Sequence, residues 1–115
     1  MFRCNKEYRT EIREKMRNGD GSVKIEHFWE PGTEMKGNTR MVARLSLEPG
    51  CSIGYHEHIN EEEIFIIIRG IAEAEDEGRK VVLHPGDTLL TGNGGHSLRN
   101  IGSETLEVIA MIAKF

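Results

Sequence analysis

The sequence predicts an all-β domain, a sandwich or barrel of about nine short strands. Apolar and polar residues alternate over several stretches of about four to eight residues, which is the periodicity of a half-buried strand. Gly- and Pro-containing turns separate these stretches, as in sequences that form β-sandwiches and barrels. No helical pattern is strong enough to change the fold class, and the chain has no internal repeat.

Length and charge narrow the class of protein further. The chain has 115 residues, with 15 basic and 19 acidic side chains and a net charge of −4 when the histidines are neutral. This length fits one domain that can bury a core without disulfide staples. A mildly acidic chain does not suggest nucleic acid or an anionic membrane as a partner. No stretch approaches the roughly 18 apolar residues of a membrane helix, and the charged N-terminus lacks the apolar region of a secretory signal. The expected location is the cytoplasm, where Cys4 and Cys51 stay reduced.

Residues 1–22 are expected to form a charged N-terminal arm, and residues 23–115 the β-barrel domain. Tyr8, Ile12 and Met16 are four residues apart, so a short helix with a thin apolar stripe is one interpretation. The low apolar content favours the other, a partly extended arm that packs on the outside of the barrel.

The expected strands of the barrel are short and separated by turns. They cover residues 23–29, 40–47, 64–68 with its continuation at 70–74, 80–83, 88–91, 96–100 and 106–112, together with the segment that carries His56 and His58. Residues 64–68 are apolar on both faces, so the barrel interior covers one face and a second layer must cover the other. Residues 75–78 are expected to form a hairpin turn.

The candidate functional residues are two histidines, a glutamate and a third histidine. Alternate residues of a strand face the same side, so His56 and His58 can aim their imidazoles at one point. Glu63, at the start of the next apolar strand, can face the same point. His96 follows a glycine-rich turn at residues 92–95 and is a fourth candidate. Imidazoles and a carboxylate that converge inside a β-structure indicate a metal site.

The spacing of these residues resembles the two motifs of the cupin family. The first motif is Gly, five residues, His-x-His, three or four residues, Glu, six residues and Gly; Gly50, His56, His58, Glu63 and Gly70 fill it. The second is Gly, five residues, Pro-x-Gly, two residues, His, three residues and Asn; Gly86, Gly94, His96 and Asn100 match it. The chain has Gly92 where the motif has Pro, and one residue fewer between Gly94 and His96. The motifs and the segment between them cover about half the chain.

The resemblance implies a single-domain cupin β-barrel, also described as a double-stranded β-helix or jelly roll. It also implies one divalent metal held by His56, His58, Glu63 and His96. Such ligands suit Mn, Fe, Co, Ni, Cu or Zn better than Ca or Mg. Four protein ligands on a six-coordinate ion leave two positions open toward the cavity, whereas a closed tetrahedral Zn would only brace the barrel.

The sequence also predicts where the residues around the four candidate ligands lie. Motif spacing and strand parity select Glu63 over Glu61 and Glu62, which are expected to form a solvated turn. Phe65 and Ile67 share the face of Glu63 and are expected to line the cavity. His27 and His84 are expected to lie outside the metal site, and Tyr55 on the face of its strand opposite His56. Arg44 has two possible positions. It either faces an anionic substrate, or it lies outside while Ala43 and Leu45 fill the interior.

The expected function is that of a metal-binding cupin that acts on or binds a small polar or carboxylate-type molecule. The enzyme classes that fit are a metal-dependent oxidoreductase (dioxygenase-like) and a lyase or decarboxylase. The alternatives are a non-catalytic binding module and a metal-braced structural protein, since fold does not fix function.

A homodimer is also expected, because Ile64, Ile66 and Ile68 face outward if Glu63 faces the cavity. Val108, Ala110 and Ile112, or their alternates, would enlarge this patch. The resemblance implies that the N-terminal arm is exchanged between subunits, so residues 8–28 are expected to lie across the partner.

Overall fold

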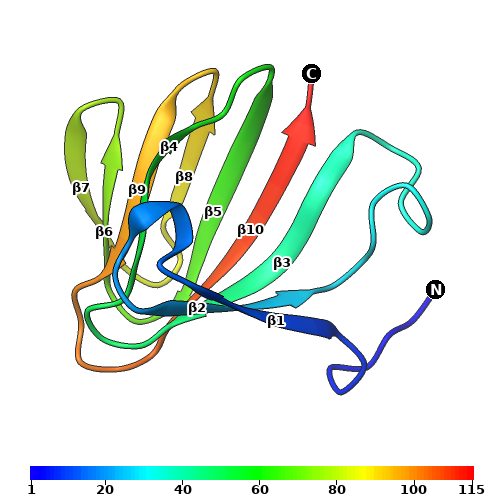
Figure 1. Cartoon of the computed structure of the whole chain (residues 1–115), viewed down its shortest axis with the longest axis horizontal. Helices are drawn as coiled ribbons and strands as arrows, with labels where there is room; N and C mark the ends of the chain where they lie inside the picture. Colours follow the sequence, from blue (N-terminus) through cyan, green and yellow to red (C-terminus); the bar gives the residue numbers. More distant parts are fainter.

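The computed structural model describes all 115 residues, and it contains ten strands in two antiparallel sheets (Figure 1). One sheet has six strands in the order β1-β2-β3-β10-β5-β8, and the other has four in the order β4-β9-β6-β7. The strands are β1 (Arg9–Glu14), β2 (Ser22–His27), β3 (Thr39–Leu47), β4 (Ser52–Glu57), β5 (Glu61–Arg69), β6 (Ala72–Asp76), β7 (Arg79–Leu83), β8 (Thr88–Gly92), β9 (Gly95–Asn100) and β10 (Leu106–Lys114). The all-β prediction is confirmed.

The core lies between the two sheets, and strand alternation decides which side chains enter it. On β5, Phe65 and Ile67 are buried, whereas Ile66 and Ile68 are 40% and 51% exposed. Fifteen buried apolar side chains from both sheets form one cluster. Burial of a single Leu, Ile or Phe contributes about 1.5–3 kcal/mol. This cluster therefore provides the main stabilisation of the barrel.

The N-terminal arm is extended, as the low apolar content predicts, and it contains no α-helix. Residues 9–14 form β1, which pairs with β2 of the same chain from Arg9 opposite His27 to Glu14 opposite Ser22. This edge strand is the addition to the nine strands expected. The structure has no helix that could serve as a membrane span.

A tight turn, the 3₁₀ helix η1 (Met16–Asn18), carries the arm from β1 back to the barrel at β4. Lys15, Arg17 and Asn18 all have positive φ, of 49°, 54° and 64°, which side chains other than Gly adopt at a cost of about 1–2 kcal/mol each. A hydrogen bond from the Lys15 N–H to the Gly21 carbonyl closes the turn at 2.8 Å.

Strand register determines which residues meet at the centre of the barrel. In the β4–β9 pair His56 lies opposite His96, and in the β5–β8 pair Glu63 lies opposite Thr91. Strand β5 begins at Glu61, three residues earlier than expected, because Glu61 pairs with Lys114 of β10 and Glu62 pairs with Gly92 of β8. This longer β5 carries the glutamate run into the sheet.

Candidate metal centre

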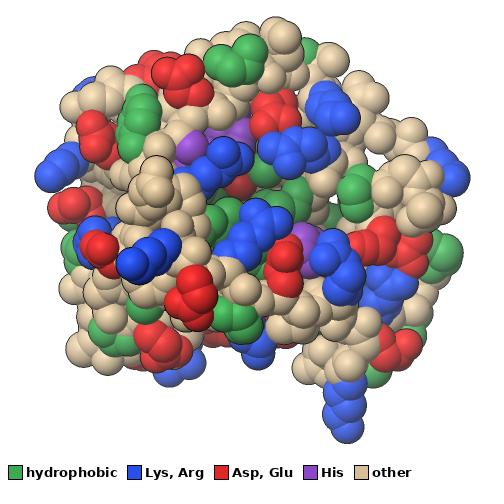
Figure 2. Space-filling model, viewed as in Figure 1, with side chains coloured by type: hydrophobic (Ala, Val, Ile, Leu, Met, Phe, Trp, Pro, Cys, Tyr) green, Lys and Arg blue, Asp and Glu red, His purple; other side chains and the backbone are tan.

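The structure brings the four predicted ligands together inside the barrel. His56 lies in β4, His58 follows directly after it, Glu63 lies in β5 and His96 in β9. One ligand atom from each residue lies within 4.8 Å of the others, and all but His56 are buried. Figure 2 shows histidine side chains in a hollow of the surface, between Lys and Arg side chains.

The distances within the cluster match those between ligands of one metal ion. The Nε2 atoms of His58 and His96 are 3.1 Å apart, and Glu63 Oε1 lies 2.9 Å from the first and 2.8 Å from the second. Two ligands at right angles on an ion, with bonds of about 2.1 Å, lie about 3.0 Å apart. The residues present therefore fit a divalent transition metal.

Hydrogen bonds to the other ring nitrogen turn each imidazole toward the centre. Nδ1 of His56 donates to the Gly54 carbonyl at 2.8 Å, and Nδ1 of His58 donates to Glu61 Oε1 at 2.8 Å. Nδ1 of His96 lies 3.0 Å from Thr91 Oγ1. Because the proton of a neutral ring then sits on Nδ1, each Nε2 presents a lone pair, as metal-binding histidines do.

Thr91 fixes the direction of its own hydrogen bond through Asp76. The Thr91 hydroxyl donates to Asp76 Oδ1 at 3.0 Å, so its oxygen is left to accept from His96 Nδ1. The ring of His96 is also stacked on Phe65, with centroids 4.7 Å apart and an interplanar angle of 10°. Both contacts hold His96 in one orientation.

The carboxylate of Glu63 and the imidazole lone pairs favour a cation at the centre of the cluster. Burial disfavours the Glu63 carboxylate, but hydrogen bonds to His58 and His96 outweigh burial and lower the pKa of Glu63. The same contact with Glu63 raises the pKa of His58, against the effect of burial, whereas burial lowers the pKa of His56 and favours its neutral form. A shared proton can join only two of these atoms in a hydrogen bond, whereas one metal ion can coordinate all four.

Glu61 is not the solvated turn residue that the sequence predicted. Its carboxylate is largely buried, and it accepts hydrogen bonds from Arg40 Nε and Nη2 at 2.7 Å each as well as from His58. The Arg40 guanidinium, opposed by burial and helped by His58, lowers the pKa of Glu61 to about 2. The prediction was wrong because Glu61 lies in β5 and shares the inward parity of Glu63.

Arg44, His27 and His84 all lie away from the four candidate ligands. Ala43 and Leu45 are in the core, so Arg44 lies on the opposite face of β3, where its guanidinium pairs with Glu26 at 3.0 and 3.1 Å. His27 contacts Glu11 at 2.8 Å, and His84 lies in an exposed turn. Arg44 therefore does not face the cavity, and neither histidine joins the cluster.

Sequence reasoning missed the residues that orient the ligands. These are Glu61, Thr91, Asp76, Arg40 and the carbonyl of Gly54. Parity along the glutamate run could have identified Glu61, which is two residues before Glu63. The contacts of Gly54 with His56 and of Thr91 with His96 are local, but they depend on ring orientations that the sequence pattern does not show. Arg40 and Asp76 depend on strand register, which the sequence does not give.

A cavity of about 70 Å³ opens beside the cluster. Its polar lining comes from His56, His58 and Glu63 and from three arginines, Arg13, Arg17 and Arg40. Met16, Met41, Leu45, Ile53 and Ile112 line the rest. Phe65 and Ile67, expected on its wall, are instead buried in the core beneath.

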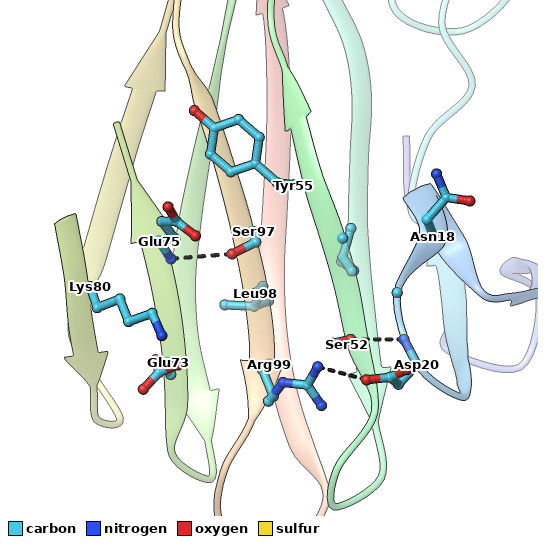
Figure 3. Close-up of a pocket in the computed structure, with 13 residues that line it drawn as sticks. Asn18, Asp20, Ser52, Tyr55, Glu73, Glu75, Lys80, Ser97, Leu98 and Arg99 are labelled. Carbon is cyan, nitrogen blue, oxygen red and sulfur yellow. Dashed lines mark hydrogen bonds and ion pairs between the residues drawn. The ribbon is translucent and has the colours of Figure 1, made fainter. Parts of the chain in front are cut away.

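A second hollow lies on the other side of the four-stranded sheet (Figure 3). Tyr55 lies there, on the face of β4 opposite His56, and Arg99 forms an ion pair with Asp20 at 2.7 Å. None of the four candidate ligands lines it. The chemistry of the metal cluster therefore belongs to the inner cavity alone.

Comparison with known proteins identifies the family. The family model of the cupin domain matches residues 43–112, which contain both predicted motifs. The chain belongs to the cupin family, and its two sheets form the jelly-roll barrel of that fold.

The chain is similar to several named proteins and solved structures. An oxalate-binding protein from Thermotoga maritima is 38% identical over 98 residues, covering 84% of this chain and 80% of the relative. The crystal structure of a predicted oxalate decarboxylase from the same organism matches with a TM-score of 0.94 and 34% identity over the whole of both chains. KdgF from Halomonas sp. matches with a TM-score of 0.77 over 100% of this chain and 96% of its own, but at 18% identity, which indicates a shared fold alone.

Proposed function

We propose that the chain is a metal-dependent binding protein for a small carboxylate-type molecule. His56, His58, Glu63 and His96 would hold one divalent transition metal, with Mn, Fe, Co, Ni, Cu and Zn all compatible with the donor set. The observation that carries the proposal is the set of three Nδ1 hydrogen bonds that leave three Nε2 atoms and Glu63 facing one point. The bound metal would supply open coordination positions for a carboxylate.

The size of the cavity supports a ligand of few atoms. A volume of about 70 Å³ is available beside the cluster. On this measure one water needs roughly 10–15 Å³, so the cavity holds on the order of five waters, or a ligand with about as many non-hydrogen atoms. A small mono- or dicarboxylate fits this space, whereas a sugar would need the cavity to open.

The polar lining of the cavity supports an anionic ligand. Arg13, Arg17 and Arg40 line it together with the metal cluster, and a guanidinium binds a carboxylate through two parallel hydrogen bonds. The relative named as an oxalate-binding protein agrees with this chemistry. The rest of the lining is apolar, so the metal and an arginine are the groups that would fix the orientation of a bound carboxylate.

Catalysis is the second candidate, and it has a specific observation in its favour. The structural match with a predicted oxalate decarboxylase covers the whole chain and supports a lyase reaction at the same site. A dioxygenase-like oxidoreductase would use the same ligand set. A metal that only braces the barrel is less consistent with the cavity that opens beside His56 and His58.

Calorimetric titration of oxalate into metal-loaded protein tests the proposal. We expect saturable binding that is lost when the metal is stripped and lost in His96→Ala. His84→Ala is the matched control, because His84 lies in an exposed turn outside the cluster. Oxalate that binds the stripped protein equally well would contradict the metal-dependent site. Disappearance of oxalate during the titration would favour the lyase over the binding protein.

We also propose that two copies pair through the outer face of the six-stranded sheet. Ile66, Ile68, Leu90 and Met111 are exposed there by 40%, 51%, 59% and 37%, and they lie on the neighbouring strands β5, β8 and β10. We call these four residues the outer patch. The alternates Ile109 and Met111 face this side, while Val108, Ala110 and Ile112 face the core. Contiguous exposed apolar surface usually marks an interface. In a two-fold dimer the outer patch of one copy would pack against the same patch of the other.

A further inference from the structure

Three arginines line the cavity beside the metal cluster, but their charges are not equally available. Arg40 is paired with Glu61, and Arg13 lies 3.1 Å from Glu11. Arg17 lines the same cavity, and no ion pair or side-chain hydrogen bond of the structure engages its guanidinium. One arginine of the three is therefore free to bind a ligand.

The charges that remain at the cavity favour a doubly negative ligand. A divalent metal bound by three neutral imidazoles and the Glu63 carboxylate carries one net positive charge. Arg17 adds a second, because the charges of Arg13 and Arg40 are balanced by their partners. An anion with two carboxylates would neutralise both, whereas a monocarboxylate would leave one unpaired.

A close contact with β4 holds Arg17 in the lining of this cavity. A Cβ at Gly54 would lie 2.0 Å from the Arg17 carbonyl oxygen, and one at Gly19 would lie 2.2 Å from the Ser52 carbonyl oxygen. Only glycines allow this approach. Gly54 thus has two contacts, since its own carbonyl also accepts the Nδ1 hydrogen bond of His56.

The backbone of Arg17 itself is in a conformation that its side chain disfavours. Its φ of 54° lies in the left-handed region, and its neighbour Asn18 is there too. Residues kept in such conformations commonly serve a functional site. Lys15 and Asn18 of the same turn share this conformation, but of the three only Arg17 lines the cavity, where its guanidinium has no ion-pair partner.

We propose that Arg17 determines the specificity of this site for a dicarboxylate, by binding the carboxylate oxygens that face away from the metal. This inference rests on the proposed function. The guanidinium presents two parallel N–H donors to a carboxylate, a geometry that a lysine does not reproduce. The turn holds the backbone in place beforehand, so less conformational freedom is lost when the ligand binds.

The test compares oxalate with acetate, by calorimetry on metal-loaded protein. Arg17→Ala should weaken oxalate binding about tenfold and acetate binding only about twofold, with unchanged metal content. Arg17→Lys should recover only part of the oxalate affinity. Arg17→Gly removes both the guanidinium and the cost of the positive φ, so it should lower oxalate affinity while the unfolding temperature stays the same or rises.

Lys15→Ala is the matched control. Lys15 has the same charge and the same left-handed backbone, lies in the same turn and does not line the cavity. Its oxalate affinity should stay within about twofold of the unmodified protein. Equal oxalate affinity in Arg17→Ala and the unmodified protein would overturn the role of Arg17 but leave the proposed function standing. If the unmodified, metal-loaded protein binds neither anion, the proposed function and this inference both fail.

Discussion

Nδ1 of His58 lies 2.8 Å from Oε1 of Glu61, and this contact connects the four candidate metal ligands to the surface of the barrel. Glu61 in turn accepts two hydrogen bonds from Arg40 on β3. The chain of contacts fixes the ring of His58 so that its Nε2 faces Glu63. A residue that binds no metal thus controls how one ligand is presented.

Replacement of Glu61 should weaken metal binding without removing a ligand. Loss of a partner that orients a ligand typically costs about 10–100-fold in metal affinity, so Glu61→Gln should fall near the lower value and Glu61→Ala near the higher. Competition with a chromogenic chelator measures the affinity. Glu62→Gln is the control, because Glu62 has the opposite parity on β5. Unchanged affinity in both Glu61 variants would show that His58 needs no orienting partner.

The Glu26–Arg44 pair on the outer side of β2 and β3 should make stability depend on pH. Its two hydrogen bonds hold the pKa of Glu26 below the usual 4.5, although burial opposes this. Because the folded-state pKa is lowered, the contribution is fully present above pH 4.5 and is lost as the pH falls through the lowered value.

Urea unfolding of Glu26→Gln measures this contribution. We expect a loss of about 1 kcal/mol at pH 7 that shrinks steadily below pH 4.5. Glu73→Gln is the control, since Glu73 lies on the outer face of β6 and makes no ion pair. A difference between Glu26→Gln and the unmodified protein that stays constant down to pH 3 would contradict the electrostatic origin.

The proposed dimer predicts a specific response to charge in the outer patch. Ile66→Lys would place an ammonium in the middle of the interface, so it should shift the protein from dimer to monomer at micromolar concentration, as read by sedimentation equilibrium. Val82→Lys is the control, because Val82 is 50% exposed on β7 of the other sheet. A monomeric unmodified protein, or a dimer that tolerates Ile66→Lys, would rule out this face.

Alternation and motif spacing were enough to predict the fold class and the four residues of the cluster. The parity of Glu63, Phe65 and Ile67 follows from the two-residue period of a strand, and the structure keeps it. The sequence leaves open the side of β3 that Arg44 occupies, because alternation does not say which face of the strand meets the core. The burial of Ala43 and Leu45 decides it, and the pairing of Arg44 with Glu26 across β2 and β3 agrees.

Other features depend on contacts between segments far apart in the chain. Glu63 of β5 meets His96 of β9 because Glu63 lies opposite Thr91 in the β5–β8 register and His96 lies opposite His56 in the β4–β9 register. The approach of Arg17 to Gly54 likewise joins the arm to β4. A one-residue slip of any of these strands would separate the partners while the hydrophobic pattern of the sequence stayed the same.

The central claim is that His56, His58, Glu63 and His96 hold a metal, and elemental analysis of the purified protein tests it most directly. The account predicts about one divalent transition metal per chain, and almost none in the double variant His56→Ala/His58→Ala, because the site depends on the number of its ligands. His84→Ala should retain the full content. Full metal retention in the double variant would contradict the account.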